Sequence, residues 1–181
     1  MATALVLLSG GLDSAACAYL LKQQGLSVSG LFVDFGQAAA PREREASTAI
    51  AKALGIDLTV RSIGPSYALG EGELPGRNAL LISLGVFELG QGAGLIAIGV
   101  HAGTRYYDCS VPFIEAINQL VQEQTDSRMA VTAPFVAWSK AEVYHVFEES
   151  GLAASDTYSC EAGSEPCGGC LSCQDRASLK C

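Results

Sequence analysis

Short apolar runs alternate with longer stretches of helical periodicity along this chain. The apolar runs have the length and the flanking turn residues of buried strands, and they predict strands at residues 5–8, 28–35, 58–63, 95–100 and 129–132. The stretches between them predict helices at residues 13–24, 41–54, 78–89, 111–124 and 139–149. Strands that alternate with helices are typical of a parallel sheet, so we expect a doubly wound, five-stranded α/β fold.

The loop after the first predicted strand reads Ser9-Gly10-Gly11-Leu12-Asp13-Ser14. Ligands of a doubly wound sheet bind beyond the carboxyl ends of its strands, where this loop lies. Two glycines let the backbone turn tightly, and a helix N-terminus and two hydroxyls add donors for a pyrophosphate. The alternative is an ordinary turn capped by Asp13 or Ser14. The string is neither a Walker loop nor a dinucleotide fingerprint, so hydride transfer is disfavoured.

Composition and charge narrow the class of ligand. The 181 residues carry a net charge of -8, which argues against broad nucleic-acid binding and favours a small-molecule substrate. No signal peptide or membrane-spanning run is evident, so we expect a cytoplasmic protein of one compact unit. Residues 64–76 hold four glycines and two prolines and are expected to form a loop near the site.

The cysteines cluster near the end of the chain, in a segment that is otherwise rich in turn residues. Four of the seven, Cys160, Cys167, Cys170 and Cys173, have the spacing of metal ligands and favour a closed structural Zn²⁺ site. Free buried thiols or an iron–sulfur cluster are the alternatives. We therefore divide the chain into an α/β domain at residues 1–155, which carries the phosphate loop, and a zinc-binding segment at 156–181 packed on it. Cys17 is expected to be a packed thiol, and Cys181 has no readable role.

The glycine loop resembles the pyrophosphate loop of the N-type ATP pyrophosphatases, which form adenylated intermediates. Together with the cysteine tail, it narrows the resemblance to the 7-cyano-7-deazaguanine synthase family, and the likeness covers most of the chain. The resemblance implies a Rossmann-like sheet of the adenine-nucleotide alpha-hydrolase type. Its motifs are residues 9–14, Phe35-Gly36-Gln37, Pro75-Gly76-Arg77-Asn78, Ile98-Gly99-Val100, Tyr107-Asp108-Cys109, Pro112-Phe113, Ser139-Lys140-Ala141-Glu142 and residues 157–176.

The family chemistry implies that a carboxyl-bearing deazaguanine is adenylated, that ammonia displaces AMP, and that further ATP drives dehydration to a nitrile. ATP, Mg²⁺ and Zn²⁺ are the implied cofactors, and a homodimer is the implied assembly. The resemblance assigns ATP binding to Ser9, Gly10, Gly11, Leu12, Asp13, Ser14, Gln37, Arg77, Asn78 and Lys140. It assigns catalysis to Asp13, Ser14, Arg77, Asp108 and Lys140, with Asp13 acting through Mg²⁺ and Asp108 reading a purine-like edge.

Most of these side chains also have simpler interpretations. Arg77 and Lys140 can be solvated surface charges, and Asn78 can be a helix cap. Asp108 can serve only its turn, and Tyr106 or Tyr107 can pack in a core instead of stacking on a heterocycle. His101 follows the fourth strand, where a structural role competes with that of a general base. These alternatives stay open at the level of sequence.

Departures from the family pattern leave the acceptor open. Ala38-Ala39-Ala40 stands where the family has Arg-His, Gly103 to Tyr107 replaces a longer run, and Cys160 is followed by Glu161. Three hypotheses follow: nitrile synthesis from ammonia, a diverged ligase that stops at an amide or joins another amine, and a zinc-stabilised nucleotide-binding module without turnover. A sulfur-inserting tRNA enzyme is disfavoured by the acidic charge and the clustered cysteines.

Overall fold

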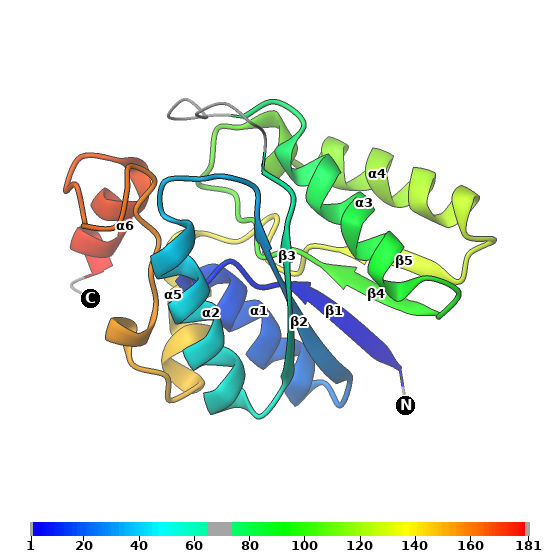
Figure 1. Cartoon of the computed structure of the whole chain (residues 1–181), viewed down its shortest axis with the longest axis horizontal. Helices are drawn as coiled ribbons and strands as arrows, with labels where there is room; N and C mark the ends of the chain where they lie inside the picture. Colours follow the sequence, from blue (N-terminus) through cyan, green and yellow to red (C-terminus); the bar gives the residue numbers. More distant parts are fainter. Residues whose placement is uncertain (1, 65–73, 180–181) are drawn as a thin grey trace.

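A five-stranded sheet forms the centre of the computed structural model, which describes residues 2–64 and 74–179 (Figure 1). The strands lie in the order β3-β2-β1-β4-β5 and every neighbouring pair is parallel. The prediction of a doubly wound, five-stranded parallel sheet is therefore confirmed. The strands are β1 (Thr3–Leu7), β2 (Ser27–Asp34), β3 (Asp57–Ser62), β4 (Gly94–Ala97) and β5 (Met129–Thr132).

The fourth strand is shorter than its apolar run predicted. It ends at Ala97, whereas the run continues to Val100. The partner strand β5 ends at Thr132, and Ile98 N–H makes one last bond to the Thr132 carbonyl at 3.0 Å. Without a partner the chain leaves the sheet at Gly99, where a Cβ would meet the Asp13 carbonyl oxygen at 2.7 Å. This close approach joins the end of β4 to the glycine loop.

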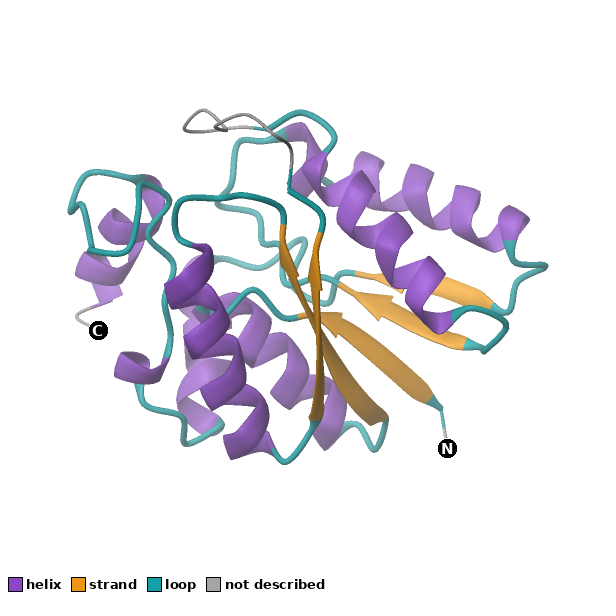
Figure 2. Cartoon of the chain, viewed as in Figure 1, coloured by secondary structure: helices purple, strands orange, loops and turns teal. Residues whose placement is uncertain are grey.

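The helices cover both faces of the sheet (Figure 2). Three pack on one face: α1 (Leu12–Gln23), α2 (Ala40–Leu54) and α5 (Lys140–Glu149). Two pack on the other: α3 (Arg77–Leu89) and α4 (Val111–Gln124). Short 3₁₀ turns lie at η1 (Tyr107–Cys109) and η2 (Ala154–Asp156). Within the described residues, no helix is both long and apolar enough to span a bilayer.

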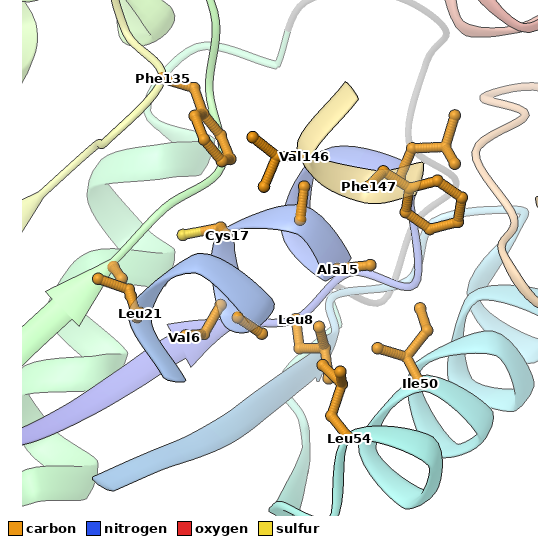
Figure 3. Close-up of a cluster of buried hydrophobic side chains, with 14 of the residues drawn as sticks. Val6, Leu8, Ala15, Cys17, Leu21, Ile50, Leu54, Phe135, Val146 and Phe147 are labelled. Carbon is orange, nitrogen blue, oxygen red and sulfur yellow. The ribbon is translucent and has the colours of Figure 1, made fainter. Parts of the chain in front are cut away.

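Helix α1 is buried on nearly all sides (Figure 3). Ala15, Ala16, Cys17 and Ala18 are fully buried, because α1 lies between the sheet and α5 and also contacts α2. Small side chains let the helix approach both neighbours closely, and Cys17 is a packed thiol as the pattern predicted. The helix therefore lacks the single apolar stripe of a surface helix. The close packing of α1 therefore holds the position of the glycine loop that precedes it.

The segment after Ser155 contains a helix that the sequence pattern did not predict, α6 (Leu171–Leu179). Its Arg176 guanidinium donates to the Thr157 hydroxyl at 2.7 Å and to the Ala154 carbonyl at 2.8 Å. The segment also contacts the glycine loop, because Tyr158 N–H donates to the Gly10 carbonyl at 2.8 Å. Of the loop expected at 64–76, residues 65–73 lie outside the described residues.

Candidate active site

The loops at the carboxyl ends of the strands surround a cavity of about 300 Å³. It brings together side chains from β2, α1, α3, α5 and the C-terminal segment, which lie far apart in the sequence. Most of the residues expected to bind ATP line it: Ser9, Gly11, Leu12, Asp13, Ser14, Gln37, Arg77, Asn78 and Lys140. Gly10 and Asp108 do not. The sheet topology therefore gathers the predicted ATP-binding residues in one place.

The glycine loop is held in its shape by two neighbours. Gly10 has φ +87°, and a Cβ there would lie 2.5 Å from the Glu43 carbonyl oxygen of α2, so only glycine fits without movement. Gly11 is the N-cap of α1, and no side chain caps it, so the alternative of a cap by Asp13 or Ser14 is wrong. The Ser14 hydroxyl instead donates to the Gly11 carbonyl at 3.0 Å. Uncapped N–H groups at a helix start suit a phosphate.

Lys140 pairs with Asp13 across the cavity. Its Nζ lies 2.6 Å and 2.7 Å from the two carboxylate oxygens, although the residues are 127 positions apart. A capping box between Ser139 and Glu142 begins α5 and places Lys140 in its first turn. The ammonium is 19% exposed and the carboxylate 29%, so this is a partly screened ion pair inside the cavity. Lys140 is thus no freely solvated surface charge.

His101 lies beside this ion pair. Its Nε2 is 3.9 Å from the Asp13 Oδ2 atom, and its Nδ1 accepts a hydrogen bond from Gly103 N–H at 3.0 Å. Burial lowers the pKa of the imidazole, and Lys140 lowers it further, while Asp13 acts in the opposite direction. The neutral ring is therefore favoured at neutral pH.

Asp108 is buried behind the cavity wall. Its carboxylate accepts the backbone N–H of Asn78 at 3.3 Å, and the Asn78 side chain donates to the Asp108 carbonyl at 2.9 Å. Helix α3 begins after Gly76, so Asn78 is inside the helix and is not its cap. This placement favours a structural role, in which Asp108 joins η1 to the first turn of α3. Burial raises the pKa of the neighbouring Cys109 thiol to about 12, so it stays protonated.

Gln37 and Glu43 form a pair on the β2 side of the cavity. The Gln37 amide accepts from Phe35 N–H at 2.9 Å and donates to Glu43 Oε2 at 2.7 Å. Burial raises the pKa of Glu43 to about 7, although Gln37 and Arg77 lower it. Sequence reasoning missed Glu43, because an acidic residue in the first turn of a helix has an ordinary explanation.

Among the residues that depart from the family pattern, Ala39 and the two tyrosines have different surroundings. Ala39 is 1% exposed and packs against Tyr158 and Cys160, so a long basic side chain has no room there. Tyr106 lines the cavity, as the stacking hypothesis requires. Tyr107 instead is 65% exposed and meets the Phe113 ring edge-on, with centroids 6.0 Å apart.

Three residues of the C-terminal segment line the cavity beside the predicted residues: Ser159, Glu161 and Asp175. Glu161 is one of the departures from the family pattern that left the acceptor open. Sequence reasoning missed Ser159 and Asp175, because the cysteine spacing of this segment indicated only a metal site. The segment is therefore a wall of the same cavity as well as a cysteine cluster.

The four sulfur atoms of Cys160, Cys167, Cys170 and Cys173 lie within 4.8 Å of one another. Tetrahedral Zn–S bonds require sulfur separations of about 3.8 Å, so small shifts suffice to close a site. Backbone N–H groups of Cys167 and Cys170 donate to Cys160 and Cys167 Sγ, each at 3.3 Å. Burial opposes ionisation of Cys160, yet backbone hydrogen bonds from Ala162 and Cys167 lower its pKa, while burial and hydrogen bonds with Cys170 and Cys160 raise the pKa of Cys173. The cluster therefore favours the thiolate that a metal needs at Cys160 first. The residues fit zinc.

Comparison with known proteins gives matches over nearly the whole chain. The model of the family described as "Queuosine biosynthesis protein QueC" matches residues 3–74 and 69–179. A 7-cyano-7-deazaguanine synthase of Methanospirillum hungatei is 35% identical, covering 96% of this chain and 92% of the relative. One of Synechococcus sp. (strain CC9605) is 34% identical, covering 96% and 90%.

Solved structures agree on the fold. An NMN synthetase of Francisella tularensis aligns with a TM-score of 0.60 at 16% identity, covering 98% of this chain and 76% of that one. A predicted subunit of a tRNA methyltransferase from Methanocaldococcus jannaschii aligns at 0.57 with 18% identity, covering 82% and 76%. At these identities the likeness concerns the fold alone. The family match and the curated relatives show that the chain belongs to the QueC family of queuosine biosynthesis proteins.

Proposed function

We propose that this chain uses ATP and ammonia to convert 7-carboxy-7-deazaguanine to 7-cyano-7-deazaguanine. The observation that carries the proposal is the 35% identity, over 96% of the chain, to a relative named 7-cyano-7-deazaguanine synthase. That similarity favours nitrile synthesis over an amide-forming ligase or a nucleotide-binding module without turnover. The cavity supports it, because a phosphate-type loop and two cations, Arg77 and Lys140, line the same space.

The chemistry needs two activations. A carboxylate is a poor electrophile, so its oxygen attacks the α-phosphate of ATP and releases pyrophosphate. Ammonia then displaces AMP and leaves an amide. A second ATP activates the amide oxygen in the same way, and loss of AMP and a proton gives the nitrile. Both steps require a site that binds pyrophosphate, stabilises negative charge and excludes water.

The residues of the glycine loop suit the pyrophosphate. The backbone N–H groups at the start of α1 supply donors, and the helix dipole adds positive potential. The hydroxyls of Ser9 and Ser14, which donate to Ser14 and to the Gly11 carbonyl in this structure, would add donors by rotating toward the pyrophosphate.

When ATP binds, Lys140 would leave Asp13 and bind phosphate oxygens. Arg77, at the start of α3 on the other face of the sheet, would neutralise further phosphate charge. We assign Mg²⁺ to the triphosphate beside Asp13, the only carboxylate of the loop.

Zinc would have a structural role in this scheme. The four cysteines would supply all four ligands that a structural zinc ion takes and would leave no open position for substrate. We propose residues 1–155 as the ATP-binding domain and 156–181 as the zinc segment packed on it. The hydrogen bond from Tyr158 N–H to the Gly10 carbonyl supports the packing of this segment on the domain. The six cysteines of the described residues are unpaired, which supports a reducing cytoplasm. The family resemblance supports a homodimer, which light scattering would test.

The direct test is incubation of the protein with ATP, Mg²⁺, ammonia and 7-carboxy-7-deazaguanine, followed by mass spectrometry. We expect the nitrile, with two AMP and two pyrophosphate released for each nitrile formed. Accumulation of amide in excess ammonia and ATP would instead support the diverged ligase. Binding of ATP without pyrophosphate release would support the module without turnover.

A further inference from the structure

His101 is placed to act on Asp13, but only after Lys140 leaves it. The imidazole is 6% exposed and lines the cavity. Its Nε2 atom lies 3.9 Å from Asp13 Oδ2, which is too far for a hydrogen bond but needs only a small shift to become one. In this structure the Asp13 carboxylate already has both oxygens engaged by the Lys140 ammonium.

The hydrogen bond to Gly103 fixes which nitrogen of His101 carries the proton. Gly103 N–H donates to Nδ1 at 3.0 Å, so Nδ1 is an acceptor and has no proton of its own. A neutral ring must then carry its proton on Nε2, the atom that faces Asp13. Gly103 allows this contact because it has no side chain: a Cβ there would lie 2.9 Å from the imidazole Cε1 atom.

Binding of ATP changes the demand on Asp13. This step rests on the proposed function, in which Lys140 turns from Asp13 to the phosphates. Even with Mg²⁺ beside Asp13, its Oδ2 atom would lose the hydrogen bond that Lys140 supplies in this structure, and an unsatisfied, partly buried carboxylate oxygen is costly. A neutral N–H donor nearby can stabilise it without competing for the phosphates.

We propose that His101 is a positioning residue for ATP binding, a tautomer-fixed donor whose Nε2–H takes over the Asp13 carboxylate when Lys140 moves to the phosphates. It is not a general base in this role, because Nδ1 is occupied and Nε2 carries a proton. The geometry therefore argues against the general-base role that the position of His101 after β4 also allowed.

Two variants separate donation from packing. His101→Gln keeps an N–H donor near the Nε2 position, whereas His101→Leu fills the volume and donates nothing. Binding of a non-hydrolysable α,β-methylene analogue of ATP is measured by calorimetry. We expect His101→Leu to raise the dissociation constant about 10-fold to 100-fold, and His101→Gln to stay within about 3-fold of wild type. His145→Leu, at the only other histidine and 74% exposed, should bind like wild type.

A double-mutant cycle tests the route through Asp13. In an Asp13→Asn background no carboxylate oxygen loses its donor when Lys140 moves, so His101→Leu should change binding by less than about 2-fold. Wild-type affinity in His101→Leu, equal losses in His101→Leu and His101→Gln, or an undiminished loss in the Asp13→Asn background would each overturn the proposal.

Nitrogen NMR of the wild-type protein keeps the proposal testable even if the leucine variant does not fold. With two histidines in the chain, His145→Gln assigns the signals. We expect the His101 proton on Nε2, and a downfield shift of that proton when the ATP analogue binds. A proton on Nδ1, or no shift at saturation, would overturn the proposal. Because the readout is ATP binding, a failure to form the nitrile would refute the proposed function and leave this inference standing.

Discussion

Replacing Gly10 by alanine tests whether the glycine loop has one permitted shape. Gly10 has φ +87°, and the added Cβ would lie 2.5 Å from the Glu43 carbonyl oxygen and 3.0 Å from the Ala46 Cβ. That turn of α2 cannot move away freely, because the Ser47 hydroxyl hydrogen-bonds the Leu8 carbonyl at 2.8 Å and the Glu43 carbonyl at 2.7 Å. The loop backbone must therefore shift instead.

Gly25 offers a matched control. It has φ +83°, but a Cβ there meets nothing within 4 Å. The left-handed conformation alone costs an alanine about 1 to 2 kcal/mol, which is the expected loss of unfolding free energy for Gly25→Ala. Gly10→Ala adds the clash, which at overpacked sites costs about 1 to 3 kcal/mol, so we expect a total of about 2 to 5 kcal/mol.

Urea unfolding measures both losses, and calorimetric titration with the ATP analogue measures the consequence for the site. A shifted loop no longer presents its N–H groups correctly, so Gly10→Ala should weaken ATP binding by about 10-fold or more, equivalent to about 1.4 kcal/mol. Gly25→Ala should bind like wild type. Equal stability losses in the two variants, or unchanged ATP affinity in Gly10→Ala, would refute the reasoning.

Three further predictions concern charge and metal. Lys140→Ala should reduce ATP-dependent pyrophosphate release by about 100-fold with an unchanged circular dichroism spectrum; near-normal release would contradict a phosphate role. Cys170→Ser should lose both bound zinc and stability, whereas Cys17→Ser should lose stability but keep its zinc. Mass spectrometry of the metal measures the zinc content of both variants. Burial raises the pKa of Glu43 from 4.5 to about 7. Between these two pH values the folded chain keeps a proton on Glu43 that the unfolded chain releases. The free energy of unfolding therefore falls as the pH rises from about 4.5 to about 7. Glu43→Gln should remove this fall of about 3 kcal/mol in urea titrations, and Glu45→Gln, at an exposed position, should retain it.

The order and type of the central elements could be predicted from local pattern. Apolar runs bounded by glycines gave five strands at the right places, because a parallel strand is buried on both faces and needs continuous apolar residues. The ends of the elements were harder to predict. Strand β4 stops at Ala97 because its partner β5 ends there, and no local sequence signal indicates where a partner strand ends. Helix α6 was missed, since its nine residues are mostly polar and have no apolar stripe, and the helix is stabilised by contacts such as Arg176 to Thr157.

The candidate site divides in the same way. A glycine loop between a strand and a helix predicts a phosphate site, because its chemistry lies in consecutive residues. The pairing of Asp13 with Lys140 depends on the sheet order that places β1 beside β4 and β4 beside β5. Asp108 shows the reverse case: its motif suggested ligand contact, but the fold turns its carboxylate to the N–H of Asn78.

By itself, the sequence determined the local features of this protein: alternating strands and helices, a loop with the residues for phosphate, and four cysteines with the spacing for zinc. The tertiary structure decided which distant residues meet. It brought Lys140 and His101 to Asp13, placed the half-buried Glu43 in the cavity wall and made the cysteine segment border the same cavity. The physical reason is that hydrogen-bonding and turn preferences act between near neighbours along the chain. Contacts across a sheet depend on strand order, which the packing of all its layers decides together.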